Sequence, residues 1–242
     1  MPGLATEGFR GAADSPSHLS FVYLACLAGH ASEFWLNHFS RRLVALLLAG
    51  LIIQGCSLKQ PIPAKQSFLL EPVRTGEARA VESLVQLRLR NLQVAAPFEG
   101  KGFVYRTSGL GYKSDFYNEF LTAPRTLISG QLQTWLGASK IFRNVFPPGI
   151  TLEATHALDG TISALYGDFQ NPSAPKAVVA AEFFLSSDQA SLSEIVFHKN
   201  YRQEIAIDGR QPEALAKGWT EALARIFTSL EQDLVLAKVQ IK

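Results

Sequence analysis

The sequence contains few of the residues that build metal sites and disulfide frameworks. Its 242 residues include two cysteines, five histidines and one methionine. So few cysteine and histidine ligands predict no metal site and no disulfide framework. The net charge is only +2, and the basic residues are spread along the chain, which predicts no nucleic-acid partner. A hydrophobic fraction of 47% and a charged fraction of 18% are typical of an ordinary globular protein.

The sequence also lacks an apolar run long enough to cross a membrane. The longest, residues 43–53, would span about 17 Å as a helix, against about 30 Å for the hydrocarbon core. Arg41 and Arg42 precede this run, and the small residue Gly55 follows it. Basic residues, a short apolar segment and a small residue at a cleavage position are typical of a secretory signal peptide.

The end of the run, Ile53-Gln54-Gly55-Cys56, resembles the bacterial lipobox. This resemblance implies cleavage between Gly55 and Cys56 and lipidation of Cys56, for example with palmitate. Two or more acyl chains hold a protein firmly to a membrane, because each buried CH₂ contributes about 0.8 kcal/mol. The alternative is a buried cysteine at the end of a core helix. A second candidate, Cys26, ranks lower because Tyr23 replaces the branched apolar residue and no basic pair stands just before it.

These features divide the chain into four parts. Residues 1–40 are expected to be a non-native or mis-annotated extension, because Met1 is the only methionine and signal peptides seldom carry so long a leader. Residues 41–55 are the predicted lipoprotein signal peptide, and the proline-containing residues 56–66 are a lipid-anchored tether. Residues 67–242 form the folded domain. After cleavage a single cysteine remains, so no internal disulfide can form.

Hydrophobic periodicity predicts an α+β domain. Strands are expected at residues 67–73, 85–90, 103–107, 141–146, 151–166, 177–185 and 192–207. Residues 112–120 are expected to be extended at first and then to form an aromatic loop. One helix is predicted after a Thr122 cap, with Pro124 in its first turn and Gly137 at its end, and a longer one from Pro212. We expect a mixed, largely antiparallel sheet with a three-stranded C-terminal meander and two amphipathic helices on one face.

The arrangement resembles the ABC-type transport auxiliary lipoprotein family of the paraquat-inducible C type. The features that carry the resemblance are Cys56, the early strand Phe68-Leu69-Leu70-Glu71-Pro72, the block Tyr117-Asn118-Glu119-Phe120 before a helix ending in Trp135-Leu136, the meander and the last helix. The resemblance implies a non-enzymatic lipoprotein that works with an ABC permease and an MCE-domain protein to move lipids or other hydrophobic molecules across the envelope. Ser57 implies, again by resemblance, the periplasmic face of the outer membrane. The N-terminal extension and Phe68, where tyrosine is more usual, depart from the family pattern.

Candidate contact residues lie in the aromatic stretch before the first helix. Phe116, Tyr117 and Phe120 could contact a partner or lipid, because aromatic residues are enriched at interface cores; alternatively, Phe116 and Phe120 cap the core. His156, on an apolar strand face, is expected to be a hydrogen-bonded core histidine. No catalytic constellation and no cofactor motif is recognised. Two other functions remain open, regulation of a cell-wall synthase and hydrolysis at an unreadable site, as does homo-oligomerisation.

Overall fold

The computed structural model describes residues 40–46, 64–78, 84–90, 92–150, 152–187 and 194–240. The chain divides after Ile62 into two units. In the first unit, residues 40–46 are helical and exposed. The predicted cleavage and lipidation residues, Gly55 and Cys56, lie outside the described residues. Among the described residues, no helix has both the length and the apolar character needed to cross a membrane.

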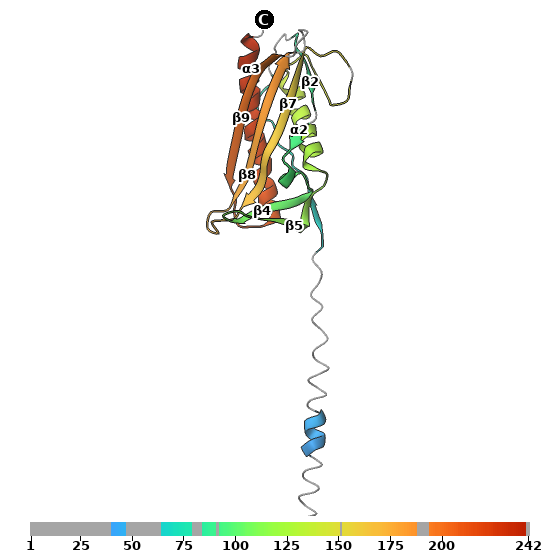
Figure 1. Ribbon diagram of the computed structural model, residues 1–242, viewed down its shortest axis with the longest axis vertical. Helices are drawn as coiled ribbons and strands as arrows, with labels where there is room; N and C mark the ends of the chain where they lie inside the picture. Colours follow the sequence, from blue (N-terminus) through green and yellow to red (C-terminus); the bar gives the residue numbers. More distant parts are fainter. Residues whose placement is uncertain are drawn as a thin grey trace, which may run out of the picture. The chain divides into compact units, whose positions relative to one another are not determined.

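The second unit, Pro63–Lys242, is an α+β domain, as the sequence predicts. Its described residues form one nine-stranded mixed sheet, a short 3-10 helix and two α-helices (Figure 1). The strands are β1 (Gln66–Phe68), β2 (Gln86–Leu89), β3 (Gln93–Val94), β4 (Gly102–Ser108), β5 (Gly111–Phe120), β6 (Asn144–Phe146), β7 (His156–Asp168), β8 (Lys176–Ser187) and β9 (Glu194–Ala206). The helices are η2 (Ala96–Phe98), α2 (Pro124–Ser139) and α3 (Pro212–Gln240).

The predicted C-terminal meander is confirmed. Strands β7, β8 and β9 are antiparallel neighbours, and the ladders run almost the full length of the strands (Figure 1). Strand β8 lies between the other two, which agrees with its apolar residues on both faces: Ala177, Val178 and Val179 are fully buried. A strand buried on both faces cannot alternate apolar and polar residues, because neither side meets water.

Strand β7 pairs with other strands along both of its edges. One edge pairs with β8, and the other pairs in parallel with β2, β3 and β4 in turn. These parallel pairings are two or three residues long, so the longest ladders are antiparallel. At about 3.3 Å per residue, the 13 residues of β7 extend for about 40 Å. The β4–β5 hairpin pairs with its C-terminal end, and β1 pairs with β5.

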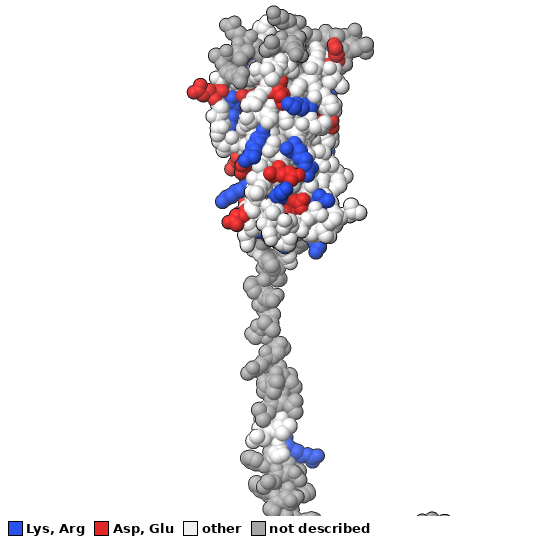
Figure 2. Space-filling model, turned by 90° about the vertical axis from the view of Figure 1, so that its left-hand side faces the viewer, with Lys and Arg blue, Asp and Glu red and all other residues white. Residues whose placement is uncertain are grey.

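Strand β9 pairs with β8 alone among the described strands, so its other edge is open. Acidic and basic side chains are interspersed over the face of the domain in Figure 2. Side chains of β9 take part in the ion pairs Lys176–Glu204, Arg202–Glu204 and Lys199–Asp233, at 2.9, 2.9 and 2.7 Å. Charged side chains on an open edge disfavour pairing with another chain.

Both α-helices cover the same face of the sheet. Phe183 of β8 lines a small cavity together with Leu132 of α2. Ala177, which has the same parity on β8, lies against Gly218 of α3. The amphipathic helix predicted from Pro212 is α3. Its apolar face is fully buried, namely Leu215, Trp219, Leu223, Ile226, Phe227, Leu230 and Leu234. The two helices also meet, because the rings of Trp135 and Phe227 pack edge to face at 5.6 Å.

The predicted ends of α2 are only partly correct. Pro124 lies in the first turn, but Ala123 is the N-cap and no side chain caps the helix, so the Thr122 cap is wrong. Gly137 does not end the helix either. The helix continues to Ser139, whose buried hydroxyl donates to Leu136 O at 2.7 Å, and the chain then turns at Lys140 with φ 57°.

Four strand boundaries also differ from the prediction. Strand β1 ends at Phe68 rather than at residue 73, β6 begins at Asn144 rather than at residue 141, and β7 begins at His156 rather than at residue 151. Residues 111–120 form one strand instead of ending in a loop. In each case tertiary pairing, which local composition does not report, decides where the strand ends.

Candidate contact surfaces

Strand β5 contains an outward bulge. Gly102 of β4 pairs with Glu119, and Val104 pairs with Ser114, so two steps along β4 correspond to five along β5. The extra residues leave the ladder, as in other β-bulges. We call residues 115–118 the aromatic bulge, because Phe116 and Tyr117 lie at its centre.

Asp115 holds the aromatic bulge in shape. Its Oδ1 accepts the backbone N–H groups of Tyr117 and Asn118 at 2.7 and 3.1 Å. Its Oδ2 accepts the Tyr105 hydroxyl at 2.6 Å and the Asn118 side-chain amide at 2.8 Å. Partial burial favours the neutral form and would raise the pKa of Asp115. The hydrogen bonds favour the ionised form more strongly, so the pKa is lowered. Burial and the carboxylate raise the pKa of Tyr105. The pair is therefore an ionised acceptor and a protonated donor at neutral pH.

The aromatic bulge exposes two of the three predicted contact residues. Phe116 is 77% exposed and Tyr117 is 38% exposed, with their rings edge to face at 5.3 Å. Phe120 is only 2% exposed and packs against Phe103 and Trp219 at 4.8 and 5.3 Å. The prediction that Phe120 contacts a partner or lipid is therefore wrong, because beyond the bulge β5 returns to the ladder and turns this side chain into the core.

The aromatic bulge lies beside the place where the chain enters the domain. Gln66 of β1 pairs with Asn118, the last residue of the bulge. Lys65 Nζ lies 2.7 Å from Glu119 Oε2 and 5.7 Å from the centre of the Phe116 ring. The hydrogen bond from Lys65, together with the charges of Lys65 and Lys101, lowers the pKa of Glu119. The described part of this unit therefore begins next to Phe116.

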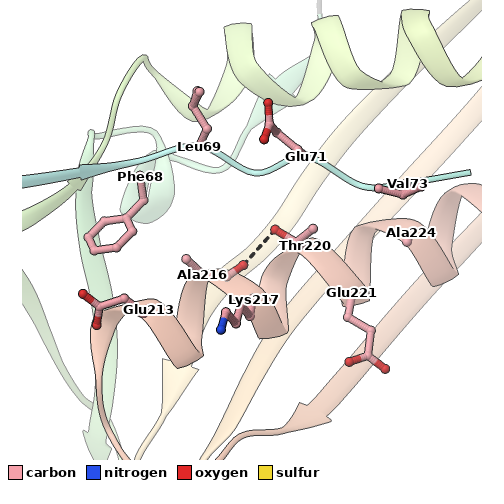
Figure 3. A pocket seen from close by; sticks show the side chains of 10 residues that line it. All are labelled: Phe68, Leu69, Glu71, Val73, Glu213, Ala216, Lys217, Thr220, Glu221 and Ala224. Atoms are coloured by element: carbon pink, nitrogen blue, oxygen red, sulfur yellow. Dashed lines mark hydrogen bonds between the residues drawn. The ribbon is translucent and has the colours of Figure 1, made fainter.

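A second surface is an open groove of about 480 Å³ between residues 68–73 and the first half of α3 (Figure 3). The small side chains of Ala216, Thr220 and Ala224 lie on the side of α3 that faces residues 68–73 (Figure 3). The Thr220 hydroxyl donates to Ala216 O at 2.9 Å, so it is already satisfied within the helix. The other lining residues are Phe68, Leu69, Glu71, Val73, Glu213, Lys217 and Glu221. Three carboxylates against one ammonium give the rim an excess of negative charge.

A buried ion pair holds the chain that follows the groove. Arg74 Nε and one terminal nitrogen donate to the two carboxylate oxygens of Glu231 at 2.9 and 2.8 Å. The indole N–H of Trp135 donates to the same carboxylate at 2.9 Å. The hydrogen bond with Glu231 raises the pKa of Arg74. Arg74, which follows the groove residues 68–73, is therefore bound to Glu231 of α3, and Glu231 is also bound to Trp135 of α2. These contacts hold residues 68–73 in place beside α3.

His156 is part of the core. His156 is buried on β7, and its Nδ1 lies 3.0 Å from the Thr155 hydroxyl, which confirms the expected core histidine. Within the described ranges, no group of three or more His, Cys, Asp or Glu side chains could hold a metal ion. The turn at residues 109–110 joins β4 to β5.

Sequence reasoning missed the groove and the bulge. The spacing of Ala216, Thr220 and Ala224, four residues apart on one helix face, was a readable signal for a groove floor. The other wall comes from a segment more than 140 residues away, which no local pattern reveals. The bulge depends on how β4 and β5 align, and this alignment is a tertiary property.

Comparison with known proteins supports the fold. No family model matches the sequence, and no curated protein matches it. Among solved structures, a Xanthomonas campestris protein of the DUF330 family has a TM-score of 0.62 at 12% identity, covering 72% of this chain and 98% of that one. An uncharacterized protein has a TM-score of 0.57 at 14% identity, with coverages of 71% and 99%. The chain therefore contains a domain with the fold of a DUF330 protein.

Proposed function

We propose that this protein is a lipid-anchored, non-enzymatic auxiliary component of an ABC/MCE-type system for lipids or other hydrophobic molecules, on the periplasmic face of the outer membrane. The observation that carries the proposal is the segment Ile53-Gln54-Gly55-Cys56, which follows a basic pair and a short apolar run. The α+β domain begins soon after it, at Pro63. Such an order suits a domain that is held at a membrane surface by acyl chains.

The geometry of the domain supports a role based on contacts. The described surface offers an aromatic bulge and an open groove, and the buried Arg74–Glu231 pair keeps the groove wall in place. An open, largely apolar groove with an acidic rim suits an extended or helical segment that carries apolar and basic side chains. We assign such a segment to the MCE-domain partner that the family resemblance implies.

The anchor is tested by comparing Cys56→Ala with Cys26→Ala in a Gram-negative host. We expect the wild type and Cys26→Ala to fractionate with the outer membrane and to carry diacyl or triacyl mass on a chain that begins at Cys56. Cys56→Ala is expected to lose that mass and to remain uncleaved. An unmodified Cys56 in an uncleaved wild-type chain would overturn the proposal.

The partner is tested by pull-down with Thr220→Arg and its matched control Thr228→Arg. Both hydroxyls donate to the carbonyl four residues earlier on α3, at 2.9 and 2.8 Å, but only Thr220 lines the groove. We expect Thr220→Arg to lose co-purification of the MCE protein and permease at least tenfold, because it adds bulk and a positive charge where a basic segment binds. Thr228→Arg is expected to behave as the wild type. Co-purification of a cell-wall synthase instead would favour the regulatory alternative.

A further inference from the structure

The distance between the aromatic bulge and the predicted anchor is limited by the chain. Nine residue steps separate Cys56 from Lys65. At most about 3.3–3.6 Å per residue, they reach about 30 Å, and Lys65 lies against Phe116. If Cys56 is acylated, the bulge therefore stays close to the bilayer surface and meets it at a high effective concentration.

The chemistry of the aromatic bulge suits a membrane interface. Phe116 is largely in water and Tyr117 exposes part of its ring, although four hydrogen bonds to Asp115 hold the backbone that presents them. Tyr is enriched at the headgroup level of bilayers, and Phe occurs on the inserted face of segments that lie in the membrane interface. The ammonium groups of Lys65 and Lys101 balance the carboxylates of Asp115 and Glu119, so these surroundings carry no excess negative charge that would repel an anionic lipid surface.

The area of the aromatic bulge favours lipid over a stable protein partner. Two aromatic side chains bury about 150–250 Å² each. A stable protein interface buries about 800 Å² on each partner, which these two rings do not approach. A surface that is already tethered to the bilayer needs much less area, because the anchor has removed most of the entropic cost of association.

We infer that the aromatic bulge inserts Phe116 and Tyr117 into the headgroup region of the membrane that holds the anchor. The inference rests on the proposed function, because it requires acylated Cys56. It also orients the domain: the N-terminal end of β7, about 40 Å from its C-terminal end, points away from the bilayer. The groove, which begins at Phe68, the last residue of β1, then opens near the membrane surface.

The test places a tryptophan in the acylated protein and measures its quenching by brominated phospholipid in vesicles. Phe116→Trp reports the bulge, and Ile195→Trp is the control. Ile195 is 62% exposed on β9 and pairs with Ser186 of β8. The next residue of β8, Ser187, pairs with the first residue of β7, so Ile195 lies at the N-terminal end of β7. The native Trp135 and Trp219 are buried, so each variant is read against an unchanged background.

We expect Trp at position 116 to lose at least about half of its added emission, as for a ring about 5–10 Å into the headgroup boundary, and Trp at position 195 to lose little. Equal, weak quenching at both positions in a protein whose acylation is verified by mass would overturn the inference alone. Absence of acylation would overturn the proposed function and this inference together. Shielding of position 116 only after addition of the MCE protein would assign the bulge to a protein partner and overturn the lipid contact.

Discussion

Asp115 shows how one side chain organises a surface to which it contributes little area. Its carboxylate accepts hydrogen bonds from two backbone amides, a phenol and a side-chain amide. These bonds hold residues 115–118 outside the ladder between β4 and β5. Because acceptance of these hydrogen bonds requires the ionised form, the shape of the aromatic bulge depends on the charge of one residue.

The first prediction concerns the pH dependence of this contact. The pKa of Asp115 is lower in the folded protein than in the unfolded chain. Its stabilisation is therefore present above the unfolded pKa of about 3.9 and is lost as pH falls through the folded pKa. In Asp115→Asn the amide nitrogen cannot accept a hydrogen bond from the Tyr105 hydroxyl. We therefore expect the free energy of unfolding to fall by about 1 kcal/mol at pH 7.

The measurement is the thermal midpoint of both proteins between pH 7 and pH 2. The difference between wild type and Asp115→Asn is expected to shrink toward zero at the acid end of this range. A difference that stays constant over the whole range would show that the carboxylate charge is not what stabilises the bulge.

The second prediction concerns the buried carboxylate of Glu231. Glu231→Ala removes the partner of Arg74 and Trp135 and leaves a mostly buried guanidinium without its counter-charge. Loss of one member of a buried pair costs about 3–5 kcal/mol, and we expect the low end because both side chains keep slight exposure.

Glu221→Ala is the matched control on the same helix, because the Glu221–Arg225 pair is exposed. Its expected cost is within about 0.5 kcal/mol. Urea unfolding measures both changes. Similar costs for the two variants would mean that the Arg74–Glu231 contact does not hold the segment after β1.

At the scale of elements, the close approach of α3 to β8 gives the third prediction. A Cβ added at Gly218 would lie 2.6 Å from Ala177 Cβ and 2.7 Å from Ile207 Cγ2, so Gly218→Ala is expected to destabilise the domain by about 1–3 kcal/mol. A Cβ at Gly130 of α2 meets nothing within 4 Å, so Gly130→Ala is expected to stabilise it by about 0.5–1 kcal/mol. Chemical unfolding of both variants gives the signs, and the same sign for both would contradict the packing of α3.

The elements with a strong period were predicted well. The helix predicted from Pro212 buries one face, and the strand predicted at residues 85–90 buries Leu87 and Leu89, because in both the apolar residues recur with the period of the element. The ends of elements were predicted less well. Gly137 favours a helix end locally, but the helix continues to bury Ser139, and β5 continues because β4 and β1 pair with it.

At the scale of the whole molecule, β7 joins parts of the chain that are distant in sequence. One of its edges takes up β2, β3 and β4 along its length, and the other begins the meander. The aromatic bulge and the groove both lie near β1, the strand at which the chain enters this unit. If Cys56 carries the proposed anchor, the anchored chain therefore enters this unit at the strand beside which both candidate contact surfaces lie.

The fourth prediction is that reductant leaves the stability of the mature protein unchanged. Cleavage before Cys56 would leave one cysteine, whose sulfur carries lipid, so burial alone must stabilise the domain. The thermal midpoint of the membrane-extracted protein should be the same with and without dithiothreitol. A fall in the midpoint on reduction would indicate a disulfide, and therefore a chain that retains Cys26 or a Cys56 without lipid.

The candidate contact surface was only half predictable. Composition identified the aromatic stretch around Phe116 and Tyr117, but it could not separate these exposed residues from the buried Phe120. The three differ in exposure because the bulge changes which face of β5 each residue occupies. Two steps along β4 correspond to five along β5, and this odd difference changes the face that the residues of β5 beyond the bulge occupy.

The sequence by itself determined the two α-helices, most of the strands in their order, the apolar faces and the lipobox-like segment before Cys56, because these depend on residues that are close together in the chain. Only the tertiary structure decided that residues 68–73 form one side of a groove along α3, that Glu231 binds Arg74, and that Phe116 lies beside Lys65. Those contacts join segments separated by about 50 to 160 residues. Which distant segments meet depends on the pairing of strands and the packing of helices, and local periodicity contains no information on either.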